Sequence, residues 1–313
     1  MIAFGPVPSR RLGLSLGVNP LPEKACSYSC RYCQVGRTNR TEIEPRAWCT
    51  PGEVVREVGS RLERLASRGE EVHVLTFVPD GEPTLDVHLG KTIEALRRFG
   101  LPIAVITNAS LLHRPDVRAR LRLADWVSVK VDAATETVWR RVNRPHPSLR
   151  FDALREGARI FAQSFEGELV TETMLVRDVN DGEAEVEKTA ECVAELAPRR
   201  AFLSVPTRPC ADAEARPSDE RAITRAYALF RERVREVELL TGYEGEAFGA
   251  TGDPESDLLA ATAVHPMREA QVQSLVARSG GGPSVVEQLV EEGRLRRVTW
   301  RDRTFYVRPI APT

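Results

Sequence analysis

The sequence predicts an α/β protein built on a parallel, partly open barrel of about six strand and helix units, followed by a small C-terminal module. Apolar runs alternate with helical patterns between residues 12 and 240. These runs are nearly continuous, as in parallel strands that are covered on both faces. The residues after 265 instead read as two helices around a glycine turn and then two strands, a pattern typical of a winged helix.

Each expected element follows from its local pattern. Leu12 to Asn19 alternates apolar and small residues and predicts the first strand. Pro51 suits the first turn of a helix, and Gly100 is expected to close the next one. Further strands are expected at 72–80, 102–108, 125–133, 169–176 and 199–207, and helices at 51–69, 89–100, 114–124, 135–142, 151–164, 183–197 and from Asp219 to Leu240.

The composition narrows the class of protein. With 44 basic and 45 acidic residues, the formal net charge of -1 gives no global footprint for nucleic acid, so RNA binding would need a local basic patch. No apolar run approaches the roughly 18 residues that span a bilayer, and the opening residues contain no apolar signal segment. We therefore expect a cytoplasmic protein without a membrane partner.

The strongest chemical signal is the stretch CSYSCRYC, which places Cys26, Cys30 and Cys33 at the spacing C-x3-C-x2-C. Cysteines packed this closely are typically ligands of a soft metal or cluster. A structural zinc site normally takes four ligands, and the chain has no second pair of that kind. Three thiolates on a [4Fe-4S] cluster would instead leave one iron open to a small molecule.

This motif, with Tyr32 just before the last cysteine, resembles the radical S-adenosylmethionine (radical SAM) enzymes. The stretches FGPVPSRRLGLSLGVNP, CQVGRT, DGEPTLD, ITNASLL, SVKVDA, VNRPHPSL and VPTRPC resemble the branch that includes the wyosine-forming, tRNA-modifying enzymes. The resemblance covers roughly residues 1–265. The additional cysteines of a second cluster and a flavin-binding appendage are absent from the sequence, which weakens a direct transfer of the wyosine reaction.

The resemblance implies a partial (β/α)6 TIM-like barrel, open on one side, with a [4Fe-4S] cluster and S-adenosylmethionine (SAM) as cofactors. The open iron would chelate SAM, and one electron from a flavodoxin or ferredoxin would release a 5′-deoxyadenosyl radical that abstracts hydrogen from the substrate. In barrels of this kind the chemistry gathers at the C-terminal ends of the strands.

The segment after the second strand matches the family's glycine and glutamate motif, which resembles a clamp for the amino group of SAM. Its residues are Asp80, Gly81, Glu82, Pro83 and Thr84. Glycine would allow the backbone to approach a ligand closely. The alternative interpretation of this segment is an ordinary turn at Asp80-Gly81.

The next two strands also end in polar residues. Thr107 and Asn108 could bind the carboxylate or ribose of SAM, although a capping role for Asn108 is equally compatible. Ser128, Lys130 and Asp132 share one face by the two-residue period. Buried charges need partners, so Lys130 and Asp132 either pair with each other or meet a polar ligand.

The last strands contribute further candidates. Glu172 and Met174 end the fifth strand, and Thr207 and Arg208 end the sixth. The resemblance assigns Val205, with Pro206, to the adenine pocket. Arg208 could bind an anionic substrate group, although a solvated surface side chain is an equal alternative. Cys210 and Lys130 are candidates for catalysis. The sequence suggests no chemical role for the segment from Arg144 to Pro147.

We expect two domains, the radical SAM barrel at 1–250 and the winged-helix-like module at 251–313. The second expected helix of the module is acidic. The expected wing, formed by the two strands and the residues next to them, carries Arg294, Arg296, Arg297, Arg301, Arg303 and Arg308. Such a module could bind RNA or DNA, recognise a peptide, or simply pack on the barrel.

Three functions remain open. The first is a radical SAM enzyme that modifies a tRNA base, and the second is one that modifies a peptide or protein, such as a glycyl-radical activase. The third is an iron-sulfur redox sensor with a DNA-binding winged helix, against which the DGEPT segment argues because a sensor needs no SAM clamp.

Overall fold

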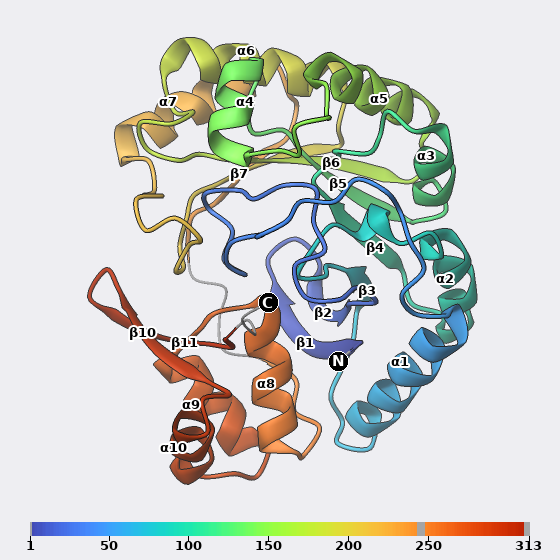
Figure 1. The fold of residues 1–313 in the computed structure, drawn as a ribbon, viewed down its shortest axis with the longest axis vertical. Coiled ribbons are helices and arrows are strands. Elements are labelled where there is room, and N and C mark those ends of the chain that lie inside the picture. Colours follow the sequence, from blue (N-terminus) through green and yellow to red (C-terminus); the bar gives the residue numbers. More distant parts are fainter. Residues whose placement is uncertain (1, 243–247, 310–313) are drawn as a thin grey trace.

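The computed structural model describes residues 2–242 and 248–309. Its larger sheet has eight strands in sequential order and curls into an open half-barrel (Figure 1). The first pair is antiparallel and the other neighbours are parallel. The strands are β1 (Ala3–Ser9), β2 (Gly13–Val18), β3 (Val74–Phe77), β4 (Ile103–Thr107), β5 (Trp126–Lys130), β6 (Glu168–Met174), β7 (Arg200–Ser204) and β8 (Val237–Leu240).

Helices lie outside this sheet (Figure 1). They are α1 (Pro51–Ala66), α2 (Leu89–Leu96), α3 (Pro115–Leu121), α4 (Glu136–Asn143), α5 (Phe151–Ser164), α6 (Glu183–Glu195) and α7 (Glu220–Arg231), with short 3-10 turns η1 (Pro83–Leu85) and η2 (Arg97–Phe99). Thr50 caps α1 in a reciprocal capping box with Glu53, and Pro51 is its first residue as predicted. Gly100 ends the α2–η2 segment in the left-handed conformation.

The predicted α/β class is confirmed, because all six expected strands are present and the sheet stays open. Two strands of this sheet were not predicted. The first, β1, contains two prolines and a break in its pairing, and prolines are tolerated there because it is an edge strand.

The second is β8, and the expectation of one helix from Asp219 to Leu240 was wrong. Helix α7 ends at Arg231, and Val237–Leu240 pairs in parallel with β7. The local pattern was helical, but hydrogen bonding to an open sheet edge decided the conformation of this stretch.

Alternation along the strands divides the barrel into layers. Its floor is an apolar cluster with one residue from each of β3 to β8, namely Val74, Ala104, Trp126, Val170, Phe202 and Leu240. The same face carries polar residues further along the strands, among them Lys130, Glu172 and Ser204. These polar groups lie at the C-terminal end of the barrel interior.

The C-terminal part contains α8 (Pro254–Val264), β9 (Met267–Arg268), α9 (Glu269–Arg278), α10 (Pro283–Glu291), β10 (Arg296–Trp300) and β11 (Arg303–Val307). Its strands form a second sheet in the order β10-β11-β9. The expected pairs of helices and strands are present, with Arg301 and Asp302 at positive φ in the turn between β10 and β11. Its identification as a winged helix, and the boundary at residue 250, stay predictions.

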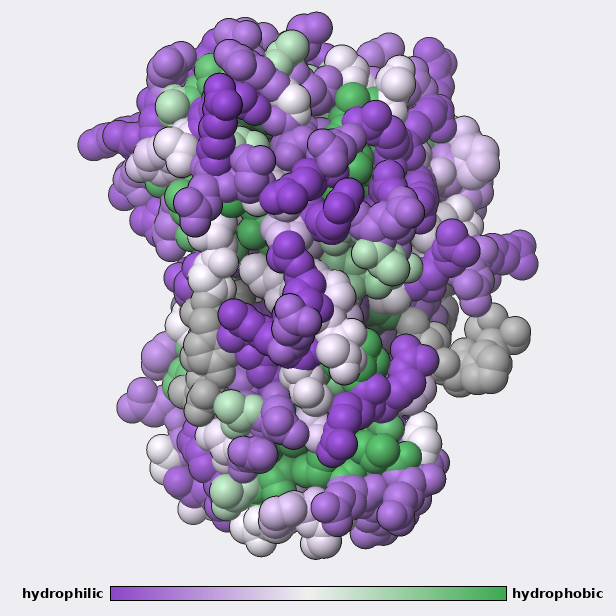
Figure 2. Space-filling view, turned by 90° about the vertical axis from the view of Figure 1, so that its left-hand side faces the viewer, coloured by the Kyte–Doolittle hydropathy of each residue, from purple (hydrophilic) through white to green (hydrophobic). Residues whose placement is uncertain are grey.

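This part has an apolar cluster of its own, which runs from Phe248 to Tyr306 in the sequence. Figure 2 shows hydrophobic surface gathered on the lower lobe of the molecule. A groove between α9 and α10 is lined by Val272, Val276, Pro283 and Val286.

A buried ion pair joins the C-terminal part to the barrel. Arg61 of α1 and Asp257 of α8 are 2% and 1% exposed, and Arg61 Nη2 lies 2.9 Å from Asp257 Oδ1. The guanidinium also donates to the carbonyl oxygen of Gly5, at 2.9 Å from Nε and 2.7 Å from Nη2. One arginine therefore ties together α1, β1 and α8. Within the described residues, no helix combines the length and apolar character needed to cross a bilayer.

Replacing Arg61 by alanine leaves Asp257 buried without its charged partner. We expect the free energy of unfolding, measured by urea denaturation, to fall by about 3–5 kcal/mol. Arg56→Ala, at an exposed position of the same helix, should change it by no more than about 0.5 kcal/mol. Equal effects of the two substitutions would contradict a stabilising role for the buried contacts.

Candidate functional site

A cavity of about 290 Å³ opens at the C-terminal end of the barrel. One side is formed by the loop between β2 and α1, which carries the three clustered cysteines. The other side is formed by the ends of β3 to β7. Its polar lining includes Arg11, Glu82, Thr107, Asn108, Lys130, Glu172, Ser204 and Arg208. The structure thus brings together residues from both halves of the barrel sequence.

Cys26, Cys30 and Cys33 are free thiols that all line this cavity. Burial raises the pKa of Cys26 to about 12, and it also raises the pKa of Cys30. Both thiols are therefore protonated in the metal-free chain, so binding a metal would release protons. Across the described residues, no three His, Cys, Asp or Glu side chains are placed to share a single metal ion. A [4Fe-4S] cluster makes a different demand, because each thiolate binds its own iron.

A different side chain donates to each thiol. Asn108 Nδ2 lies 3.7 Å from the first sulfur, Asn143 Nδ2 lies 3.4 Å from the second, and Lys24 Nζ lies 3.3 Å from the third. The donors come from the end of β4, the end of α4 and the loop itself. Hydrogen bonds to cysteine sulfur orient the ligands and tune the potential of a bound cluster.

The end of α4 holds the backbone of the cysteine loop. Ser29 N–H donates to the carbonyl oxygens of Asn143 and Arg144, at 3.2 and 3.1 Å. In the other direction, His146 N–H donates to Ser27 O at 2.9 Å. The segment from Arg144 to Pro147, to which the sequence assigned no chemistry, therefore positions the thiols through its main chain.

Gly81 allows a close approach, but the partner is the protein backbone. A Cβ on Gly81 would lie 1.9 Å from the carbonyl oxygen of Ala25, the residue before the first cysteine. The neighbouring Glu82 N–H donates to the same oxygen at 2.9 Å. The glycine thus seats the loop after β3 on the cysteine loop.

The Glu82 side chain is 1% exposed and lines the cavity. Its Oε1 accepts from the hydroxyls of Thr84 and Thr107, both at 2.6 Å, and its Oε2 accepts from Asn108 N–H at 2.7 Å. Burial raises the pKa of this carboxyl despite these hydrogen bonds. In this structure Glu82 links the end of β3 to the end of β4.

Lys130 and Glu172 form the centre of a buried charged network. Lys130 Nζ lies 3.2 Å from Glu172 Oε1 and 3.6 Å from Asp132 Oδ1, so the pairing alternative for Lys130 and Asp132 is observed. Arg11 also pairs with Glu172. Burial opposes ionisation of Glu172, but Lys130 and Arg11 outweigh it and lower its pKa to about 2. Burial opposes the charge of Lys130 as well, but Asp132 and Glu172 outweigh it and raise the pKa of Lys130.

Asp132 orients Tyr32. The carboxylate accepts from the Tyr32 hydroxyl, from Asn143 Nδ2 at 2.8 Å and from Met174 N–H at 2.8 Å. Lys130 Nζ lies 5.0 Å from the centre of the Tyr32 ring. Asp132 and Lys130, at the end of β5, therefore hold Tyr32 of the cysteine motif in place.

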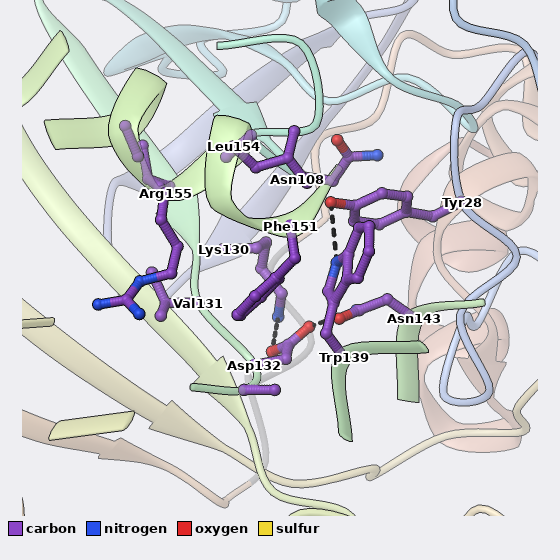
Figure 3. A pocket seen from close by; sticks show the side chains of 14 residues that line it. Tyr28, Asn108, Lys130, Val131, Asp132, Trp139, Asn143, Phe151, Leu154 and Arg155 are labelled. Atoms are coloured by element: carbon purple, nitrogen blue, oxygen red, sulfur yellow. Dashed lines mark hydrogen bonds and ion pairs between the residues drawn. The ribbon is translucent and has the colours of Figure 1, made fainter. Parts of the chain in front are cut away.

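Asp132 borders a smaller cavity of about 70 Å³ (Figure 3). Tyr28, Trp139 and Phe151 form its aromatic wall, and Trp139 Nε1 donates to the Tyr28 hydroxyl at 3.1 Å. These rings pack the cysteine loop against α4 and α5.

The other predicted residues divide into two groups. Val205, Thr207, Arg208 and Cys210 line the large cavity, and burial raises the pKa of the Cys210 thiol to about 12. Asp80, Pro83 and Asp132 are not among the described residues that line that cavity. Asp80 instead accepts from Asn19 Nδ2 at 3.1 Å, and Pro83 begins η1. The roles of all these residues in cofactor binding or catalysis stay predictions.

Sequence reasoning missed Arg11 and Asn143. Arg11 lies in the turn between β1 and β2, and β1 itself was not predicted. Asn143 ends a helix whose place beside the cysteines depends on the tertiary fold. Both residues lie in stretches that carried the family resemblance, FGPVPSRRLGLSLGVNP and VNRPHPSL, but nothing in the local pattern gave either residue a role.

Comparisons with known proteins identify relatives of this chain. Residues 23–192 match the radical SAM superfamily. The chain is 43% identical to the UPF0026 protein MJ1312 of Methanocaldococcus jannaschii, over 99% of this chain and 96% of that protein. It is also 34% identical to a UPF0026 protein of Synechocystis, over 66% of this chain and 76% of that protein.

Solved structures share the fold. TYW1 with a lysine-pyruvate adduct bound superposes with a TM-score of 0.57 at 16% identity, covering 72% of this chain and 76% of that one. Streptococcus suis SuiB bound to S-adenosylmethionine gives 0.54 at 12% identity, covering 77% and 56%. The incomplete TIM-like barrel is thereby confirmed.

The cofactors of the matching superfamily are a [4Fe-4S] cluster and S-adenosylmethionine. The cysteine motif, the half-barrel with its cavity at the strand ends and the match over residues 23–192 lead to one conclusion: this chain belongs to the radical SAM superfamily.

Proposed function

We propose that this protein is a radical SAM enzyme in which Cys26, Cys30 and Cys33 hold the [4Fe-4S] cluster and the large cavity binds SAM. The observation that carries the proposal is the placement of all three thiols on the rim of that one cavity. When reduced by a flavodoxin or ferredoxin, the bound cofactors would supply a 5′-deoxyadenosyl radical that abstracts hydrogen from a substrate.

The donor set fits a cluster with one open iron. Three thiols face the cavity from one loop, and each accepts a hydrogen bond from the surrounding protein. SAM carries both an ammonium and a carboxylate group, and the cavity offers Glu82 and Lys130 with opposite charges. Thr107 and Asn108 provide further polar groups, and Val205 provides an apolar surface for adenine.

The first substrate candidate is a tRNA base. It is supported by the motifs that resemble wyosine-forming enzymes and by three exposed arginines, namely Arg296 and Arg303 of the C-terminal strands and Arg301 of the turn between them. The second candidate is a peptide or protein. It is supported by the fold likeness to SuiB bound to its precursor peptide SuiA, at a TM-score of 0.53 and 12% identity over 74% of this chain and 50% of that one.

Replacing any one of Cys26, Cys30 or Cys33 by alanine is expected to abolish cluster assembly, because each thiolate is one of only three protein ligands. Iron content and the paramagnetic signal of the reduced protein, after reconstitution without air, are the measurements. The 5′-deoxyadenosine formed from SAM after dithionite reduction should fall to background as well. Cys192→Ala, on α6, is the control and should retain both. Full iron content in the three variants, or zinc in the wild-type protein, would falsify the assignment.

Gly81→Ala tests the contact between the loop after β3 and the cysteine loop. Because the new Cβ would lie 1.9 Å from Ala25 O, the backbone must shift, at an expected cost of roughly 1–3 kcal/mol in stability. We expect a lower iron content per chain after reconstitution. Gly182→Ala is the matched control, since a Cβ there meets nothing within 4 Å. Equal iron content in both variants would show that the close approach is unimportant.

The tRNA candidate predicts binding that weakens as salt rises, because phosphate contacts release counterions. Replacing Arg301 and Arg303 together by glutamine should weaken tRNA binding and reduce the slope of log K against log salt by about two. Filter binding at several salt concentrations measures this. If tRNA binding to the protein does not change with salt concentration, the tRNA candidate is contradicted and the peptide candidate remains.

A further inference from the structure

A second cavity, of about 120 Å³, adjoins the large one inside the barrel. The two cavities share Arg11, Gln34, Val78, Ile106 and Arg208 as lining residues. The two cavities therefore adjoin at these five side chains. The inner cavity is too small for a nucleoside or a peptide, but it has room for a group of a few heavy atoms.

The lining of the inner cavity is cationic. Arg11 and Arg208 both border it, and no carboxylate does so among the described residues. Arg208 Nη1 donates to Gln34 Oε1 at 3.0 Å, which fixes the orientation of the guanidinium. Arg11 pairs with Glu172. Glu172 lines the large cavity and is not among the described residues that line the inner one.

His265 adds a polar group without a partner. It is 6% exposed, it lines the inner cavity, and its Nε2 has no hydrogen-bond partner within the described part of the chain. Its ring packs edge-on against Phe248 at 5.3 Å between centroids. Leaving a buried polar atom unpaired destabilises the fold, so a ligand atom that bonds to Nε2 would remove this penalty.

The charge state of this histidine is also defined. Burial and the nearby Arg208 both lower the pKa of His265 well below its usual value, so the imidazole is neutral at neutral pH. A neutral imidazole with its proton on Nε2 donates one hydrogen bond. Two guanidinium groups and one such donor match the oxygen atoms of an anion.

We propose that the inner cavity is a substrate subsite that binds a carboxylate or phosphate end group through Arg11, Arg208 and His265. The inference rests on the proposed function only in taking the large cavity as the SAM site. It restricts the substrate to a molecule whose reacting carbon lies within reach of an anionic end group. His265 follows α8, so the C-terminal part of the chain would contribute directly to substrate selection.

The test is calorimetric titration of the full-length, cluster-containing protein with inorganic phosphate and, separately, with acetate, in a buffer free of other anions. We expect saturable binding of at least one probe, and the stronger probe identifies the end group. Arg208→Gln should weaken that binding by about tenfold or more, because a charged hydrogen-bond donor is lost. His265→Phe keeps an aromatic ring against Phe248 and should weaken it several-fold. Arg98→Gln, at an exposed position of η2, should leave it unchanged.

Absence of saturable binding by either probe would overturn the proposal, as would equal affinity in wild-type protein, Arg208→Gln and His265→Phe. If Arg208→Gln does not fold, His265→Phe decides. The proposed function fails separately, since it requires 5′-deoxyadenosine formation from SAM. Anion binding without SAM cleavage would support the anion subsite and contradict the proposed enzymatic function. SAM cleavage without anion binding would support the enzymatic function and contradict the subsite.

Discussion

The structure depends above all on how the main chain of the cysteine loop is held. This loop runs between β2 and α1 with little regular secondary structure, so its backbone groups need partners from elsewhere. The end of α4 supplies carbonyls to Ser29 and Arg31, the loop after β3 donates to Ala25 O, and Ala211 N–H donates to Cys33 O at 2.8 Å. Three separate elements therefore fix the thiols before any cofactor binds.

The same constraint explains why the neighbouring residues are so specific. Gly81 has no space for a side chain, and Glu82 uses its buried carboxylate to join the ends of β3 and β4. Asp132 reaches back from β5 to hold Tyr32. Residues that the family resemblance assigns to SAM thus also build the wall against which SAM would lie. Preorganisation of this kind is typical of sites whose chemistry is supplied by a cofactor.

The buried charges in the barrel interior pair with one another. Lys130, Glu172 and Arg11 lie above an apolar floor and satisfy one another across three elements. A buried ion needs this compensation, because desolvation of an isolated charge would destabilise the fold. The C-terminal part is joined to the barrel by the buried contact of Arg61 with Asp257, which lies at the opposite end of α8 from His265. The segment after the barrel is therefore part of the cavity wall as well as a separate apolar cluster.

The sequence by itself determined the α/β class, the six central strands and the cysteine motif, because short-range periodicity and ligand spacing encode these features directly. It also placed Thr107, Asn108, Lys130 and Val205 at strand ends that border one cavity. Only the tertiary structure decided that residues 237–240 form a strand, since the open edge of β7 supplies the hydrogen bonds. It also decided that Arg11, Arg208 and His265, which are distant in sequence, line one cavity. This arrangement arises from the curling of the sheet and the packing of α8 against β1, for which no local pattern exists.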